Sequence, residues 1–132
     1  MGSVRWIVDG MNVIGSRPDG WWKDRGRAMA ALVDSLDRWA SSRGEDVTVV
    51  FERPPATPSA ATAIEVAHAP RAAPNSADDE IVRLVGADAR PGDIRVVTSD
   101  RALAGRVTGL GASAYPAERF RDLIDAPDPR GS

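Results

Sequence analysis

The chain has 132 residues, of which 42% are hydrophobic and 27% charged, a balance that is typical of one globular domain and excludes a disordered or fibrous protein. Cysteine is absent, which excludes disulfides and thiolate zinc sites. The net charge of −2 argues against a protein that coats nucleic acid through bulk positive charge, although a local basic surface can still hold a phosphate backbone.

The N-terminal segment predicts a cytoplasmic protein. No charged region followed by a long apolar stretch and a small-residue cleavage site precedes the strand-like segment that starts at Val4, so no signal peptide is visible. No apolar run approaches the roughly 20 residues that are needed to cross a bilayer. Because the lack of cysteine also fits a reducing compartment, we expect a cytoplasmic location and no membrane partner.

The first half of the chain predicts two buried strands around a long helix. Val4–Val8 is a short apolar run, typical of a strand buried on both faces, and a loop is expected after it. Over Asp24–Ser42 the apolar residues recur every three or four positions, which predicts an amphipathic helix that Gly44 ends. The β-branched run Val47–Phe51 predicts the second strand.

The middle of the chain predicts a loop, a weaker strand and a helix. Arg53–Thr62 is rich in proline and alanine and is expected to be a loop. Ala63–Ala69 alternates Ile64, Val66 and His68 on one face, which predicts a weaker strand. Ser76 is a candidate helix cap with Asp79 at the third helical position, so a helix is predicted over Ala77–Val85.

The last third predicts a third strong strand and two more helices. Ile94–Thr98 is apolar and β-branched, and Ala102–Val107 is expected to continue as a helix that nearby glycines stop. Ala112–Tyr115 is a candidate for a last short strand. Pro116 is suited to a helix start, and apolar residues at helical spacing follow it.

Strands that alternate with helices in this way predict an α/β fold. We expect a single domain over residues 1–125, with three layers, a mainly parallel central sheet, helices on both faces and right-handed crossovers. Residues 126–132 are expected to form a flexible C-terminal tail.

Acidic residues stand where several elements of this expected fold reach one edge of the sheet. Asp9 follows the first strand, Asp100 follows the third strong strand, and Asp78 and Asp79 open a helix. Ligands of open parallel sheets bind beyond the carboxyl ends of the strands. Each acid alone is more simply a turn or cap residue. Together they favour a bound cation, because carboxylates about 4 Å apart repel by roughly 4 kcal/mol at an effective dielectric near 20.

A site made of carboxylate oxygens is suited to Mg²⁺ or Mn²⁺. Mg²⁺ keeps several waters and binds through a few carboxylates together with substrate phosphate, which suits phosphodiester hydrolysis. No protein nucleophile is then required. This fits a chain without cysteine, whose one histidine, His68, is expected to be an ordinary strand or rim residue.

Three segments of the chain carry a family resemblance: Ile7–Gly15, Ser76–Ile81 and Val96–Asp100. In this order they resemble the motifs of NYN domains, particularly the bacterial YacP-like group, within the PIN-like nuclease superfamily. With the strand and helix pattern, the similarity covers nearly the whole chain. The resemblance implies a PIN-like three-layer fold and metal-dependent ribonuclease activity.

The resemblance also implies which residues form the site. The implied metal ligands are Asp9, Asp78, Asp79 and Asp100, and Asn12 is implied to orient Asp9 or the substrate. Two positions depart from the family pattern: Glu52 stands where relatives often have aspartate, and Ala104 stands where some NYN ribonucleases have another acid. These departures leave open a PIN-like module that holds RNA, or a ribosome-associated partner, without cutting.

A stretch of cations and large rings follows the first acidic motif and predicts a surface for single-stranded RNA. Its residues are Arg17, Trp21, Trp22, Lys23, Arg25 and Arg27. Arginines near a helix N-terminus run against the preference for acids there, which indicates a bound anion. A tryptophan pair that anchors the loop among solvated arginines explains the stretch equally well. Arg101 is a further candidate, either for the scissile phosphate or for a neighbouring carboxylate.

A phosphatase of another α/β class is the remaining alternative. No G-x-G-x-x-G or P-loop glycine pattern follows the first strand, and Asp9 lacks the second aspartate two residues later that phosphoaspartyl phosphatases use. The sequence therefore favours a ribonuclease, and it leaves the oligomeric state open.

Overall fold

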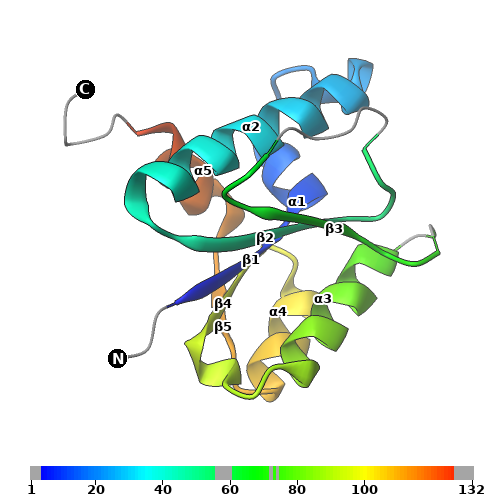
Figure 1. The fold of residues 1–132 in the computed structure, drawn as a ribbon. Helices are drawn as coiled ribbons and strands as arrows, with labels where there is room; N and C mark the ends of the chain where they lie inside the picture. Colours follow the sequence, from blue (N-terminus) through cyan, green and yellow to red (C-terminus); the bar gives the residue numbers. More distant parts are fainter. Residues whose placement is uncertain (1–3, 56–60, 72, 74, 127–132) are drawn as a thin grey trace.

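A computed structural model of the chain describes residues 4–55, 61–71, 73 and 75–126. Its centre is a five-stranded sheet in the order β3-β2-β1-β4-β5, in which all neighbouring strands are parallel (Figure 1). The strands are β1 (Arg5–Asp9), β2 (Asp46–Phe51), β3 (Glu65–His68), β4 (Ile94–Val97) and β5 (Ser113–Tyr115). The predicted parallel sheet is confirmed.

Helices cover both faces of this sheet, as Figure 1 shows. On one face lie α1 (Gly10–Ile14), α2 (Arg25–Arg43) and α5 (Ala117–Asp125), and on the other lie α3 (Ser76–Ala87) and α4 (Arg101–Gly109). Two 3₁₀ turns, η1 (Trp21–Lys23) and η2 (Pro91–Asp93), complete the described elements. The predicted three-layer α/β architecture is confirmed.

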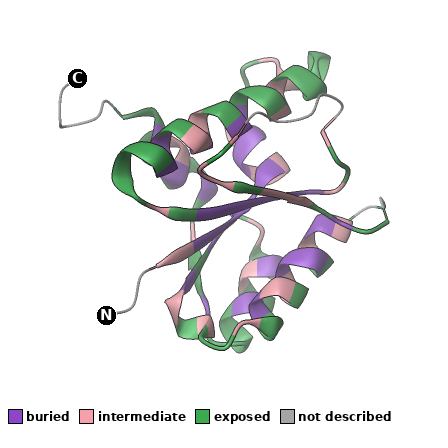
Figure 2. Ribbon diagram, in the orientation of Figure 1, coloured by how far each residue is buried: buried purple, intermediate pink, exposed green. Residues whose placement is uncertain are grey.

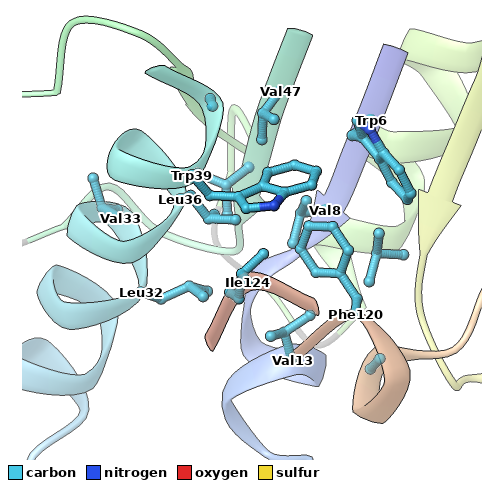
Figure 3. Packing of buried hydrophobic residues seen from close by; sticks show 14 of the residues in the cluster. Trp6, Val8, Val13, Leu32, Val33, Leu36, Trp39, Val47, Phe120 and Ile124 are labelled. Atoms are coloured by element: carbon cyan, nitrogen blue, oxygen red, sulfur yellow. The ribbon is translucent and has the colours of Figure 1, made fainter. Parts of the chain in front are cut away.

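Apolar side chains fill the space between the sheet and each helical layer. The ribbon coloured by burial shows buried residues along the strands and on the helices of both layers (Figure 2). On the α2 and α5 side, the core is built around aromatic rings: Trp39 and Phe120 have ring centroids 5.4 Å apart, and Trp6 lies 5.2 Å from Phe120 (Figure 3). The predicted stripe of α2 is confirmed, because Leu32 and Leu36 are buried on the same face. The sheet is therefore held rigidly between two packed layers.

The order of the strands places one junction at the centre of the sheet. From β1 the chain moves outward through β2 to β3, and it then returns to add β4 and β5 on the other side of β1. The carboxyl ends of β1 and β4 consequently lie next to each other where the winding direction reverses. Ligands of open α/β sheets bind at such a switch point.

The segment after β1 differs from the sequence prediction. A loop was expected there, but Gly10–Ile14 forms α1, which begins directly at the end of the strand. The helix has 5 residues and is too short to show helical periodicity in the sequence. It can begin at Gly10 because this residue has no side chain and lies against the buried ring of Phe51.

The start of α3 also differs in detail. Ser76 was predicted as the cap, but Asn75 takes that position with a left-handed φ of 63°, and Ser76 is the first residue of the helix. The hydroxyl of Ser76 accepts a hydrogen bond from the Ala73 N–H instead. The predicted capping box with Asp79 is therefore wrong. Gly44 ends α2 in the left-handed region, as predicted.

Two sequence expectations concern the ends of the chain and membranes. Of the predicted tail, residues 126–132, only Ala126 lies within the described residues. Among the helices of the described ranges, none is long and apolar enough to span a bilayer.

Replacing Gly10 with alanine is expected to destabilise the fold by about 1–3 kcal/mol, the usual cost of overpacking a core. A Cβ atom at this position would lie 2.4 Å from Cε1 of Phe51. Thermal unfolding measures the loss. Gly105→Ala is the matched control, because this helical glycine has no neighbour within 4 Å and alanine there favours the helix. Equal stability of the two variants would contradict the packing argument.

Candidate metal centre

The candidate site lies at the junction of β1 and β4. Asp9 is the last residue of β1, and the segment Thr98–Asp100 leads from β4 into α4. Asp78 lies in the first turn of α3, which covers the same face of the sheet as α4. Elements from three distant parts of the sequence thus bring carboxylates to one edge.

Asp9 is buried, with 6% of its surface exposed. Burial raises the pKa of its carboxyl to about 7, against a hydrogen bond from Thr98 that lowers it. The charges of Asp78 and Asp100 raise the pKa further, and the backbone of Asn12 lowers it. Asp9 is therefore a desolvated carboxylate that faces other negative charges, and a cation is the partner that would relieve both effects.

Thr98 links the two strand ends through its hydroxyl. The Oγ1 atom donates to Oδ2 of Asp9 at 3.0 Å and accepts from the backbone N–H of Asp100 at 3.1 Å. The side chain is buried, so its orientation is restrained on all sides. Sequence reasoning placed Thr98 in the third motif but assigned it no role, because its contact with Asp9 depends on the pairing of β1 with β4.

Asn12 and Asp100 are fixed by backbone hydrogen bonds. Oδ1 of Asn12 accepts from the N–H of Ser99 at 2.8 Å, which ties α1 to the segment after β4. Oδ1 of Asp100 accepts from the N–H groups of Ala102 and Leu103, so Asp100 is the cap of α4. Both cap bonds use the same oxygen. Among the contacts of the described residues, Oδ2 of Asp100 therefore stays available for a ligand.

The two acids of α3 have different surroundings. Asp78 is half-buried, and burial followed by the charge of Asp100 raises the pKa of its carboxyl, while Arg106 lowers it. Glu52, directly after β2, contributes a smaller rise. Asp79 is more exposed and accepts a hydrogen bond from Arg106 of α4 at 3.0 Å. The carboxyl of Asp78 therefore interacts electrostatically with the other acids of the site, whereas Asp79 is paired with Arg106 at the border of the site.

Arg106 is a residue of this neighbourhood that sequence reasoning missed. It lies six positions after Asp100, and no motif marks it. Its guanidinium pairs with Asp79 and acts on Asp78, so one cation balances part of the negative charge. No local pattern in the sequence indicates this pair, because Asp79 and Arg106 are 27 residues apart and meet only where α3 lies beside α4.

The donor set fits a hard divalent cation. Asp9, Asp78 and Asp100 offer only carboxylate oxygens, the ligands that Mg²⁺ and Mn²⁺ prefer. Among the described residues, no group of three or more His, Cys, Asp or Glu side chains is arranged so that it could hold a metal ion by itself. This is compatible with Mg²⁺, which is bound through few carboxylates and keeps several waters.

The predicted RNA-facing residues fall into two groups. Trp21 and Trp22 pack with ring centroids 5.9 Å apart, and the guanidinium of Arg25 lies 5.5 Å from the Trp21 ring. Trp22 is 52% exposed, and Lys23 and Arg27 are exposed beside it. These residues form one surface of cations and rings at η1 and the start of α2. The helix end itself is capped, since Asp24 accepts from the N–H of Arg27.

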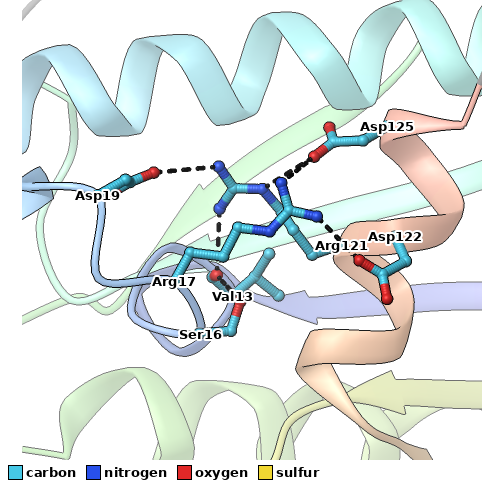
Figure 4. Close-up of polar contacts among 7 residues, drawn as sticks. All are labelled: Val13, Ser16, Arg17, Asp19, Arg121, Asp122 and Asp125. Atoms are coloured by element: carbon cyan, nitrogen blue, oxygen red, sulfur yellow. Dashed lines mark hydrogen bonds and ion pairs between the residues drawn. The ribbon is translucent and has the colours of Figure 1, made fainter.

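The second group consists of Arg17 and Arg101. Arg17 forms ion pairs with Asp122 and Asp125 of α5, at 2.9 and 2.7 Å (Figure 4). The structure thus joins Arg17 to α5. Arg101 is exposed at the start of α4, directly after Asp100. His68, which was predicted to be an ordinary strand or rim residue and is not in either group, is exposed at the end of β3, where its ring contacts the Ala69 carbonyl.

Comparisons with known proteins give one matching family and similar solved structures. The family model described as YacP-like NYN domain matches residues 6–130. The fold is similar to the crystal structure of Rae1 (YacP) from Bacillus subtilis, with 26% identity, a TM-score of 0.71, and coverage of 92% of this chain and 75% of that chain. A single-residue variant of the same protein matches with 27% identity, a TM-score of 0.71, and coverage of 92% and 77%. In the comparison with curated proteins, nothing matches.

Proposed function

Since the chain belongs to the YacP-like NYN domain family, we propose that it is a divalent-metal-dependent endoribonuclease that hydrolyses phosphodiester bonds within RNA. Its fold is of the PIN-like nuclease type. The observation that carries the proposal is the group Asp9, Asp78 and Asp100, whose charges act on one another at the switch point of the sheet. We call these three residues the acidic site.

The residues of the acidic site and those that position them have different roles in the proposal. Asp9, Asp78 and Asp100 would hold Mg²⁺ or Mn²⁺, with Asp79 and Glu52 at the border. When bound, the metal supplies positive charge against the phosphodiester and activates water for attack. Thr98 holds the Asp9 carboxylate in one orientation, and its burial keeps solvent away from that bond. Asn12 fixes the segment that carries Asp100.

The proposed substrate is single-stranded RNA. Trp22 offers an exposed ring on which an unpaired base can stack, which duplex RNA does not present. Lys23, Arg25 and Arg27 supply positive charge beside the ring, and Arg101 lies next to the acidic site. In this proposal Arg17 contributes by holding the segment before η1 against α5. The cytoplasm, where RNA is available, is the proposed location.

A second candidate is a module that binds RNA or a ribosome-associated partner without cutting. Ala104 favours it, because some NYN ribonucleases carry an acid at that position. The arrangement of the acids favours it too, since no three of them among the described side chains are placed so that they could hold a metal ion by themselves. The same surface of cations and rings would serve this function.

Incubation with a labelled single-stranded RNA oligonucleotide separates the two candidates. With Mg²⁺ or Mn²⁺ we expect internal cleavage products, and with EDTA we expect none. Asp100→Asn should reduce cleavage by at least 100-fold, whereas Asp93→Asn is the matched control, because η2 precedes β4 at the opposite edge of the sheet. Cleavage that persists in EDTA would contradict the metal-dependent proposal. Salt-dependent binding without products would favour the second candidate.

Arg106→Gln is expected to tighten Mn²⁺ binding by a factor of about 2–5 at low ionic strength, because it removes a positive charge that competes at the border of the site. Isothermal titration measures the change, which should shrink as salt screens the charges. Arg38→Gln is the control, since its pair with Asp34 is exposed on α2. Weaker Mn²⁺ binding in the Arg106 variant would contradict this account.

A further inference from the structure

A pocket of about 420 Å³ lies between α2, α5 and the segment that joins α1 to α2. Ile14, Leu32 and Ile124 contribute apolar surface and Trp21 contributes a ring. Charges of both signs come from Asp19, Asp24, Lys23, Arg27 and Arg121. A volume of this size is in the range of small-molecule sites. The lining combines apolar and charged side chains in about equal share. None of these residues takes part in the acidic site.

Arg121 reaches into this region from α5 with spare hydrogen-bonding capacity. Its three contacts are long: 3.3 Å to the carbonyl of Val13, 3.5 Å to Asp125 and 3.7 Å to Asp19 (Figure 4). A guanidinium has five N–H donors in one plane. The Asp19 carboxylate is half exposed, and at 3.7 Å it lies beyond hydrogen-bond distance of the guanidinium. The pair thus offers donors and an acceptor to a planar ligand.

The helix α1 connects this pocket with the acidic site. It begins directly after Asp9 and ends at Ile14, which lines the pocket. A helix of this length rises by about 7.5 Å, at roughly 1.5 Å per residue. This is a span that one or two nucleotides of an extended strand can bridge. Trp21 lines the same pocket and packs against exposed Trp22, so the rings continue from the pocket to the surface.

We propose that this pocket binds one unstacked base of the RNA strand, close to the nucleotide whose phosphate meets the acidic site. The inference rests on the proposed ribonuclease function and adds a specificity site to it. A base matches both the apolar and the polar parts of the lining. Its faces are apolar, and its edge carries donors and acceptors for Asp19 and Arg121. A phosphate alone would leave the apolar floor without a partner. An apolar peptide side chain would leave the charged groups of the lining without a partner.

The pocket can be tested without catalysis. In EDTA, nucleoside 5′-monophosphates should shift the NMR signals of the Trp21 indole N–H and the Arg121 side chain, whereas ribose 5-phosphate should not. Ala31→Phe fills the pocket from the exposed side of α2 and should weaken this binding at least tenfold. Ala30→Phe is the matched control, because this exposed neighbour on α2 does not line the pocket.

Each outcome decides the inference. Base-dependent shifts that Ala31→Phe removes and Ala30→Phe keeps support it. Shifts that ribose 5-phosphate reproduces, shifts that both variants keep, or no shifts at all overturn it. The cleavage assay remains separate: metal-dependent cutting without base-dependent shifts overturns only the pocket, and base-dependent shifts without any cutting overturn only the ribonuclease proposal.

Discussion

Asp9→Asn is expected to abolish RNA cleavage and, at the same time, to stabilise the metal-free protein at alkaline pH. Cleavage is lost because an amide at this position neither carries the negative charge nor binds Mg²⁺ as a carboxylate does. Stability rises because the ionised carboxylate is buried and faces Asp78 and Asp100. Asparagine has nearly the same shape, and its amide oxygen can still accept from Thr98.

The pH dependence of this effect has a definite sign. Burial raises the pKa of Asp9 from 3.8 to about 7, so between these values the folded protein binds more protons than the unfolded chain. The free energy of unfolding therefore falls as pH rises through this window. The difference corresponds to about 4 kcal/mol above pH 7, at roughly 1.4 kcal/mol per pH unit. Asp9→Asn should remove this contribution.

Urea unfolding in EDTA at pH 5 and pH 8 measures both effects. The parent protein should lose stability between the two values, and the variant should lose much less, so the variant should be the more stable protein at pH 8. Added Mn²⁺ should stabilise the parent protein and leave the variant nearly unchanged. A variant that is less stable than the parent at pH 8 would show that Asp9 is held in the fold by contacts other than those described.

Thr98→Val is expected to weaken metal binding and cleavage by about 10–100-fold, the usual effect of removing a group that orients a metal ligand. Valine has nearly the same volume, so the core between β1 and β4 should stay packed. Asp9 would lose its donor at 3.0 Å, and the Asp100 N–H would lose its acceptor at 3.1 Å. The Asp9 carboxylate would then be free to rotate away from the shared position, while Oδ1 of Asp100 keeps its cap bonds to α4.

Mn²⁺ titration and single-turnover cleavage measure the effect of Thr98→Val. The matched control is Thr48→Val, because Thr48 is also a buried threonine of the sheet but pairs with Ile7 in the middle of β1. The control should keep its metal affinity within a factor of about two. A Thr98 variant with unchanged affinity and rate would contradict the role assigned to the hydroxyl.

The parallel sheet and the position of the acids could be predicted from the sequence because both depend on local patterns. Apolar runs such as Ile94–Thr98 identify strands, and a parallel sheet brings the ends of its strands to one edge. The helix Gly10–Ile14 could not be predicted in this way. It spans less than two turns, so its pattern was too short to distinguish from a loop.

The contacts that shape the site are long-range and therefore had no local signal. Thr98 meets Asp9 across 89 residues, and Arg17 meets Asp125 across 108. The first contact depends on the register of β1 and β4, and the second on the position of α5. Sequence reasoning could place Arg17 beside the tryptophans along the chain but not identify its ion pairs. The roles of the predicted metal ligands and RNA-facing residues stay predictions.

The most direct test of the central claim is a crystal of the protein soaked in Mn²⁺ and measured for anomalous scattering. We predict one anomalous peak bounded by the carboxylates of Asp9, Asp78 and Asp100 at the junction of β1 and β4. A peak elsewhere on the molecule, or no peak at this edge with Mn²⁺ in excess, would contradict the metal centre and the ribonuclease proposal that depends on it.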